Sequence, residues 1–283
     1  NVCTGPPGCK DVFARDRDSD GNGILDEVGG TTTRVSVGPG GLESDGHSEN
    51  PLVSDDGRFV LFQSAGTNLV TGDTNADADI FVHDRSTGVT ERVSVDSLGA
   101  EGNSQSGYYW SAISADGQIV AFCSYASNLV AGDTNGYPDV FVRDRATGVT
   151  ERVSVDSSGN QGNGVCYDPA ISGDGRYVAF ESLSSNLVPG DTNGTADVFV
   201  HDRQTGATER VSVDSSGDQG NGYSGTPDIS GDGRYVAFTS SADNLVPGDT
   251  NGVADAFVHD RQTGTTERAS VDSSGNQGNG YCF

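Results

Sequence analysis

The sequence predicts an all-β protein built from tandem four-stranded antiparallel units. A pattern of 58 to 60 residues recurs along the 283-residue chain, and its tripeptide Asp-Thr-Asn begins at Asp73, Asp133, Asp191 and Asp249. The apolar segments of each unit are short, rich in Val, Phe and Tyr, and bounded by Gly, Asp and Asn, as is typical of strands. No stretch keeps a helical period. Four-stranded units in tandem predict a β-propeller.

The third unit shows how each strand is predicted. Its strands are expected near residues 169–172, 176–182, 197–203 and 208–213. Asp-Gly and Thr-Gly dipeptides lie between neighbouring strands and indicate tight turns, so the strands should follow one another as an antiparallel meander. By the same pattern, four complete blades are predicted at residues 51–95, 111–155, 169–213 and 227–271.

Residues 1–37 match only the second half of a unit. Residues 11–17 read Asp-Val-Phe-Ala-Arg-Asp-Arg and correspond to the third strand of later units, while residues 33–37 correspond to the fourth strand. The whole chain, 1–283, is therefore predicted to be a single domain of four complete blades plus a half blade, the equivalent of five blades.

A half blade exposes an unpaired strand edge, which favours aggregation. Three arrangements would protect this edge. The tail 272–283 could pair with the N-terminal half and close the ring, although it is too short to supply two full strands. The ends of neighbouring molecules could pair head to tail. The missing strands could also lie beyond Phe283 in a longer protein.

The composition excludes some classes of partner. With 16 basic and 41 acidic residues the formal net charge is −25, so nucleic acids and anionic lipids would be repelled. The same charge favours cations as ligands. No apolar run approaches the roughly 20 residues of a membrane span. The chain has no Met, which fits a trimmed secretory precursor or a piece of a longer chain. We therefore expect a secreted protein, extracellular or at the cell surface.

Two motifs resemble a known repeat. Residues 172–180 read Ser-Gly-Asp-Gly-Arg-Tyr-Val-Ala-Phe, and residues 197–203 read Asp-Val-Phe-Val-His-Asp-Arg. Together they resemble the TolB-like (WD-like) β-propeller repeat of bacterial exported proteins, over nearly the whole chain. The resemblance implies the fold and export. Because that family includes periplasmic binding modules, protease-associated propellers and uncharacterised surface proteins, the resemblance implies no single function.

The strongest candidate site is an acidic turn between the two strands of the half blade. Acidic or amide side chains fall at positions 1, 3, 5 and 9 of an EF-hand-like loop, with a glycine at position 6 and a backbone carbonyl at position 7. The predicted calcium ligands are Asp18, Asp20, Asn22, Ile24 and Asp26. Position 12 is Gly29 and no helices flank the loop, so it resembles the calcium loops of thrombospondin-type and integrin-type repeats. The alternative is a solvated acidic turn.

A second candidate cation site recurs in the loop before the third strand of each complete blade. Each copy offers Asp, Asn and Asp at loop positions 1, 3 and 7. The residues are Asp73, Asn75, Asp79, Asp133, Asn135, Asp139, Asp191, Asn193, Asp197, Asp249, Asn251 and Asp255. Three side chains underfill a calcium shell of about six to eight oxygens, and Asp and Asn also cap turns. Weak calcium binding and turn capping are both open.

The chain has five cysteines, and an odd count in a secreted chain indicates a free thiol or a bond to another chain. Cys3 and Cys9 flank a short Pro/Gly loop and are predicted to form a disulfide, and Cys123 and Cys166 a second one across a blade junction. Cys282 is the repeat equivalent of Cys166 but has no partner in its own blade. The alternatives for Cys282 are an intersubunit bond, a buried thiol or a rearranged intrachain pair.

The remaining motifs argue against catalysis. His83, His201 and His259 share one repeat position that Arg143 fills in the second unit, as expected for polar strand residues. No nucleophile elbow, zinc-protease motif or phosphate loop is present. The Asp-Arg pairs ending the third strands are predicted to pair across strands with the arginines of the fourth. Those arginines are Arg92, Arg152, Arg210 and Arg268.

An aromatic cluster, Gly107-Tyr108-Tyr109-Trp110, precedes the second complete blade. We expect it to fill core at a blade junction. If it were exposed, it would favour binding of a sugar or a protein partner. A clustered acid–base pair in the central channel would favour an enzyme.

We therefore predict a non-catalytic, secreted, calcium-stabilised β-propeller with a structural or adhesive role at or beyond the cell surface. Self-assembly head to tail into extracellular polymers or filaments is part of this hypothesis. The expected partners are copies of the chain or other surface proteins, and not nucleic acid. The alternative is a protein- or glycan-binding module that uses one propeller face.

Overall fold

The computed structural model describes residues 9–18, 25 and 30–280. Within these residues the regular structure is almost entirely β, apart from one turn of 3₁₀ helix, η1 (Pro39–Gly41). The all-β prediction is confirmed. No helix in this part of the chain has the length and apolarity needed to cross a membrane.

The strands form one two-stranded and four four-stranded antiparallel sheets within the described residues. The two-stranded sheet pairs β1 (Phe13–Asp16) with β2 (Thr31–Arg34). Sheet 1 contains β3 (Ser48–Val53), β4 (Phe59–Ser64), β5 (Asp79–Asp84) and β6 (Val89–Arg92). Sheet 2 contains β7 (Ser106–Ile113), β8 (Ile119–Ser124), β9 (Asp139–Asp144) and β10 (Val149–Arg152).

The last two sheets repeat the same plan. Sheet 3 contains β11 (Cys166–Ile171), β12 (Tyr177–Ser182), β13 (Asp197–Asp202) and β14 (Ala207–Arg210). Sheet 4 contains β15 (Ser224–Ile229), β16 (Tyr235–Ser240), β17 (Asp255–Asp260) and β18 (Thr265–Arg268). In each four-stranded sheet, strands adjacent in sequence are hydrogen-bonded neighbours, so each sheet is the predicted meander.

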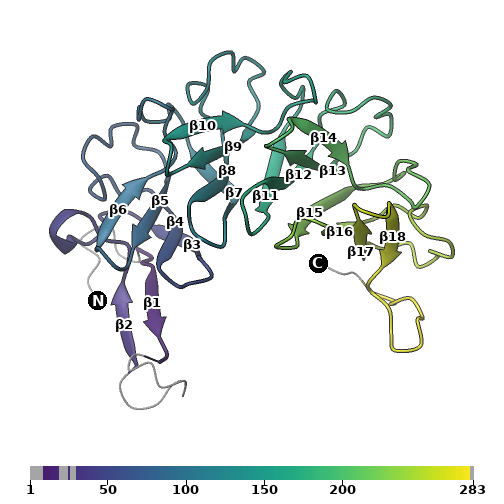
Figure 1. Ribbon diagram of the computed structural model, residues 1–283, viewed down its shortest axis with the longest axis horizontal. Coiled ribbons are helices and arrows are strands. Elements are labelled where there is room, and N and C mark those ends of the chain that lie inside the picture. The colour runs from purple at the N-terminus through teal and green to yellow at the C-terminus, as the bar shows by residue number, and fades with distance from the viewer. Residues whose placement is uncertain (1–8, 19–24, 26–29, 281–283) are drawn as a thin grey trace.

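The sheets follow one another along an open arc (Figure 1). The first strands of the four-stranded sheets, β3, β7, β11 and β15, lie on its concave side, and the last strands lie on its outer side (Figure 1). The predicted blade ranges begin three to five residues after these sheets begin and end three residues after they end.

The core lies between neighbouring sheets rather than inside any one of them. Residues of sheets 1 and 2 form one cluster, sheets 2 and 3 a second, and sheets 3 and 4 a third. Each four-stranded sheet also stacks two phenylalanine rings from its middle strands, as Phe180 and Phe199 do at 5.9 Å between centroids. The repeated Val and Phe positions therefore form a layered core, because neighbouring sheets cover one another's faces.

The repeated Thr-Glu-Arg tripeptide links the sheets to one another. In sheet 3, Thr208 Oγ1 donates to the Val155 carbonyl of the preceding connection at 2.6 Å. Glu209 pairs with Arg261 of the following sheet at 2.6 Å. Arg210 instead faces aspartates of its own sheet. One tripeptide thus contacts the sheet before it, the sheet after it and its own loop.

The described part of the C-terminal tail folds back on itself. Asp272 N donates to the Asn276 carbonyl at 2.9 Å, and Val271 bridges Gln277. The backbone hydrogen bonds of residues 272–280 stay in this turn or reach Ser270, just after sheet 4, so none of them closes a ring with β1 and β2.

Candidate functional site

A cavity of about 440 Å³ opens where the four concave-side strands converge. Leu52 and Val53 of β3 line one side, and residues 110–113 of β7, 168–171 of β11 and 226–228 of β15 complete it. All four first strands contribute, so the cavity exists only because the repeat brings them to one surface. Such a concave surface suits a ligand, because it supplies contacts from several sides.

Each of these strands carries a backbone irregularity at the same repeat position. The residues are Asn50, Trp110, Asp168 and Thr226, with φ of 55°, 57°, 48° and 48°. The strand pairing shifts register at this point in every sheet. Positive φ is costly for side chains such as Trp and Thr. The repeated bulge re-aims one side chain per sheet, and three of them, Trp110, Asp168 and Thr226, enter the cavity lining.

Trp110 is the chain's single tryptophan and is 61% exposed. Strand β7 has eight residues where β11 has six, because Gly107-Tyr108-Tyr109 stands where β11 has Tyr167 alone. Gly107 has φ of 81°, and a Cβ there would lie 2.2 Å from Ile80 Cδ1, so only glycine fits. The predicted core role of the cluster is wrong for Trp110. The ring lies at the surface, at the bulge position that is shared with the other sheets.

Sheet 3 places two carboxyl groups at the bulge. Asp168 Oδ1 is buried without a hydrogen-bond partner, while Glu181 Oε2 accepts the Tyr223 hydroxyl at 2.9 Å. Burial and then the Glu181 charge raise the pKa of Asp168 to about 6. Burial also raises the pKa of Glu181. No motif predicts this pair, because the two residues are 13 positions apart on different strands.

The equivalent pairs in other sheets are neutral. In sheet 1, Asn50 Nδ2 donates to Gln63 Oε1 at 3.3 Å, and in sheet 4 the hydroxyls of Thr226 and Thr239 lie 2.8 Å apart. Only sheet 3, among the described sheets, opposes two acids at this position. A carboxyl pair with a raised pKa beside a cavity is chemically a hydrogen-bonding or proton-transfer group.

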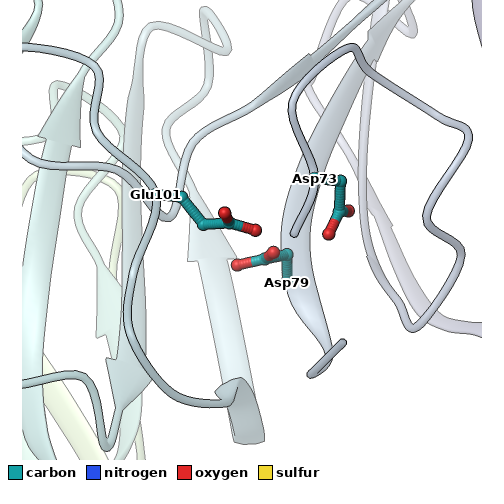
Figure 2. Close-up of side chains that lie close together, drawn as sticks. All are labelled: Asp73, Asp79 and Glu101. Atoms are coloured by element: carbon teal, nitrogen blue, oxygen red, sulfur yellow. The ribbon is translucent and has the colours of Figure 1, made fainter. Parts of the chain in front are cut away.

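The recurring Asp-Asn-Asp loops are organised around arginine. In sheet 1, the carboxylates of Asp73, Asp79 and Glu101 point toward one another (Figure 2). Arg92 Nη1 lies 2.7 Å from Glu101, 3.2 Å from Asp79 and 3.6 Å from Asp73. Burial and then the Asp79 charge raise the pKa of Asp73 to about 6. Burial opposes ionisation of Glu101, but hydrogen bonds from Thr74 lower its pKa to about 2.

The other loops repeat the arginine but not the third carboxylate. Arg152, Arg210 and Arg268 lie 3.3 to 3.8 Å from pairs of aspartates in sheets 2, 3 and 4. These pairs are Asp133 with Asp139, Asp191 with Asp197, and Asp249 with Asp255. In each of these loops the chain itself thus places one cation, an arginine, beside the two aspartates.

The asparagines of these loops cap turns, which is one of the two roles that the sequence left open. Asn75 Oδ1 accepts the backbone N–H of Asp77 at 2.8 Å, and its Nδ2 donates to Asp79 and to the Gly102 carbonyl. The same contacts recur at Asn135, Asn193 and Asn251. Their oxygens are used by the backbone, so Glu101, rather than Asn75, completes the acidic cluster. A signal existed in the sequence, since Gln161, Gln219 and Gln277 fill that repeat position elsewhere.

The predicted calcium turn lies between β1 and β2. Asp18 N donates to Asp16 Oδ1 at 3.1 Å. The other predicted ligands, Asp20, Asn22, Ile24 and Asp26, lie outside the described residues.

The cysteines of sheets 2 and 3 meet as predicted but are free thiols. Cys123 Sγ donates to the Cys166 carbonyl at 3.3 Å, and Cys166 Sγ lies 3.1 Å from the Ser182 hydroxyl. Burial raises the pKa of Cys166 to about 12. The thiols therefore fill core and hydrogen-bond locally. The predicted partner of Cys9, Cys3, and the unmatched Cys282 lie outside the described residues.

The histidines are confirmed as polar strand residues. His83, His201 and His259 each place Nδ1 2.8 to 2.9 Å from a threonine hydroxyl on the next strand. Arg143 donates to the equivalent Thr150 hydroxyl at 3.0 Å. Burial lowers the pKa of all three histidines, which suits a neutral structural role.

The predicted cross-strand partners of the Asp-Arg pairs are wrong. Asp84 accepts two bonds from Arg58, at 3.0 and 2.7 Å, rather than from the fourth strand. Arg85 donates to the Gly57 carbonyl at 2.6 Å. These side chains fasten the turn between β3 and β4 to the end of β5, which frees Arg92 for the acidic loop.

No model of a known protein family matches the sequence, and no curated protein matches it significantly. Similar solved structures include TolB from Acinetobacter baumannii, with 18% identity, a TM-score of 0.49, and coverage of 84% of this chain and 45% of that one. A putative TolB from Agrobacterium tumefaciens has 18% identity, a TM-score of 0.49, and coverage of 86% and 66%. An oligogalacturonate lyase in complex with manganese has 12% identity, a TM-score of 0.48, and coverage of 87% and 60%. The chain spans about half to two thirds of the length of these proteins.

Proposed function

We propose that this chain is a non-catalytic, exported β-propeller module that binds a neutral glycan on its concave face. The observation that carries the proposal is the exposure of Trp110 at the edge of the shared cavity. The bulge repeated in all four sheets holds this bulky residue at positive φ, which costs stability, and binding would explain why an exposed tryptophan stands there. This favours the binding-module alternative over a purely structural role.

The chemistry of the lining fits a sugar. An exposed indole ring can stack on the apolar face of a pyranose, and Asp168, Asp228 and Thr226 supply oxygens for hydroxyl groups. The aliphatic side chains of Leu52 and Val53 are also exposed at the rim. Acidic ligands are disfavoured, because the cavity carries carboxylates and the chain has a net charge of −25.

Isothermal titration calorimetry with neutral hexasaccharides tests the proposal. Cellohexaose, chitohexaose and maltohexaose form the panel, with hexagalacturonate as the acidic control. We expect one neutral sugar to bind and W110A to weaken it at least tenfold. Y137A is the matched control, because Tyr137 is an exposed aromatic residue outside the cavity lining. Binding that W110A leaves unchanged, or a preference for the acidic sugar, would refute the proposal.

A structural or adhesive role through self-assembly is a second proposal, favoured by the exposed face of sheet 4. Ala179 and Val200 of sheet 3 are buried, whereas their equivalents in sheet 4, Ala237 and Val258, are exposed and half-buried. This face could accept another sheet, from a second copy or from elsewhere. Light scattering with and without chelator tests it. A 29.2 kDa particle under both conditions would refute assembly.

The remaining sequence hypotheses stay proposals of the same kind. They are secretion, calcium in the Asp18 to Asp26 turn, closure of a five-blade-equivalent ring, and a Cys3–Cys9 disulfide. The absence of catalysis is also proposed. Asp168 with Glu181 is the pair that would carry a reaction if that proposal failed, and hydrolysis of the bound sugar in the calorimetry samples would reveal it.

A further inference from the structure

Three carboxylates of sheet 1 surround one arginine. Asp73, Asp79 and Glu101 place ligand oxygens within 4.8 Å of one another (Figure 2), and Arg92 is the cation among them. The Asp73 side chain is 2% exposed, yet its Oδ1 is buried without a hydrogen-bond partner. Three carboxylates against one guanidinium leave two negative charges uncompensated. A buried, unpaired carboxylate oxygen is costly unless a cation or a donor meets it.

The later sheets show what sheet 1 lacks. In sheet 3, Gln219 Nε2 donates to Asp191 Oδ1 and to Asp197 Oδ2, both at 2.8 Å. Gln277 makes the same two bonds in sheet 4, at 2.6 and 3.1 Å. Glu101 occupies this position in sheet 1, where the same kind of isolated bridge fixes it. A carboxylate cannot donate. The change from Gln to Glu therefore removes a donor and adds a charge.

The backbone around this position accepts either residue. Thr74 N donates to Glu101 Oε1 at 2.9 Å, and Thr192 N donates to Gln219 Oε1 at 3.1 Å. Glutamate is thus not needed to hold the loop in place. Its distinctive contribution is the negative charge beside Asp73.

The contacts of Arg92 show which oxygens of the loop attract positive charge. Its Nη1 donates to Glu101 and to Asp79, and its Nη2 donates to the Gly72 carbonyl at 3.1 Å. Carboxylate and carbonyl oxygens are the ligands that calcium prefers. The guanidinium makes no hydrogen bond to Asp73 Oδ1, so this oxygen is available to a second cation.

We propose that this cluster binds a divalent cation of the calcium type. Asp73 contributes the unpartnered oxygen, and Asp79 and Glu101 contribute charge. The site differs in its ligands from the Asp-Asn-Asp pattern and is separate from the turn that begins at Asp18. It connects the loop before β5 to the segment joining sheets 1 and 2, so an ion there stabilises that junction. The inference does not depend on glycan binding.

Calorimetric titration of the full chain with calcium chloride tests the proposal. The protein used as the parent for these measurements carries D18N, D20N and D26N, which remove three carboxylates of the predicted calcium turn between β1 and β2. We expect this parent to bind calcium and E101Q to weaken binding at least tenfold, or about 1.4 kcal/mol. Since sheets 3 and 4 already hold glutamine here, E101Q should fold normally, and circular dichroism checks this.

A reciprocal variant guards against an indirect effect. Q219E adds a third carboxylate to Asp191 and Asp197 in sheet 3, and we expect one further equivalent of bound calcium. A parent that takes up no calcium would overturn the proposal. So would an E101Q variant that binds as tightly as the parent.

Discussion

Replacing Asp168 with asparagine should stabilise the protein at neutral pH. Asp168 Oδ1 is buried without a donor, and the pKa of its carboxyl is raised to about 6 from an ordinary value of 3.8. An acid whose pKa is higher in the folded chain contributes its full stability below the unfolded pKa, near 4, and loses it as the pH rises through about 6. D168N removes this ionisation. Its amide could also donate to Glu181, as Asn50 donates to Gln63.

The size of the stabilisation by D168N follows from the shift in the pKa of Asp168. About two pKa units correspond to about 3 kcal/mol, and solvent screening of the half-buried side chain reduces this to about 1–2 kcal/mol. We therefore expect D168N to raise the free energy of unfolding by about 1–2 kcal/mol at pH 7.5 and to have little effect at pH 4.

Urea denaturation followed by circular dichroism, from pH 4 to pH 8, measures this difference. D228N is the matched control, because Asp228 lines the same cavity and its Oδ1 accepts a hydrogen bond from Ile229 N that asparagine preserves. A D168N effect that is independent of pH, or that is destabilising at pH 7.5, would refute the reasoning.

Two further predictions concern the packing between sheets and the buried thiols. Thr208→Val leaves the buried Val155 carbonyl without the hydroxyl that donates to it at 2.6 Å, so we expect urea denaturation to show a free energy of unfolding lower by about 1–3 kcal/mol. Thr205→Val, at an exposed turn position, should lower it less, and equal losses would contradict the linking role of Thr208. Cys123 and Cys166 are buried, so iodoacetamide should not label them in the native protein, and peptide mass spectrometry measures this labelling. Rapid labelling of either residue in the native protein would contradict its position in the core.

The repeat predicted the fold because each structural role recurs at a fixed interval. The strands around Phe180 and Phe199 and the turns between them were predictable from local patterns alone. The partners of the charged residues were less predictable. Arg92 was expected opposite the Asp84–Arg85 pair, but it turns into the acidic loop, because Arg58 already holds Asp84. Where several opposite charges lie close together, three-dimensional packing decides which arginine pairs with which carboxylate.

The candidate sites depend on departures from the repeat. Trp110 follows a two-residue expansion of one strand, and Glu101 replaces a repeated glutamine. Both departures are visible in the sequence, but their consequences are not. Whether Trp110 enters the core or solvent depends on the backbone of the bulge, and the pairing of Asp168 with Glu181 depends on strand register. These properties arise only when the sheets are assembled.

The fluorescence of Trp110 tests the central claim most directly, since it is the chain's single tryptophan. The native protein should emit like a solvated indole, be strongly quenched by acrylamide, and lose that quenching when a neutral hexasaccharide binds. This result would support an exposed ring in a ligand site on the concave face. Blue-shifted emission that resists acrylamide until the protein unfolds would contradict the account, because it would place Trp110 in the core.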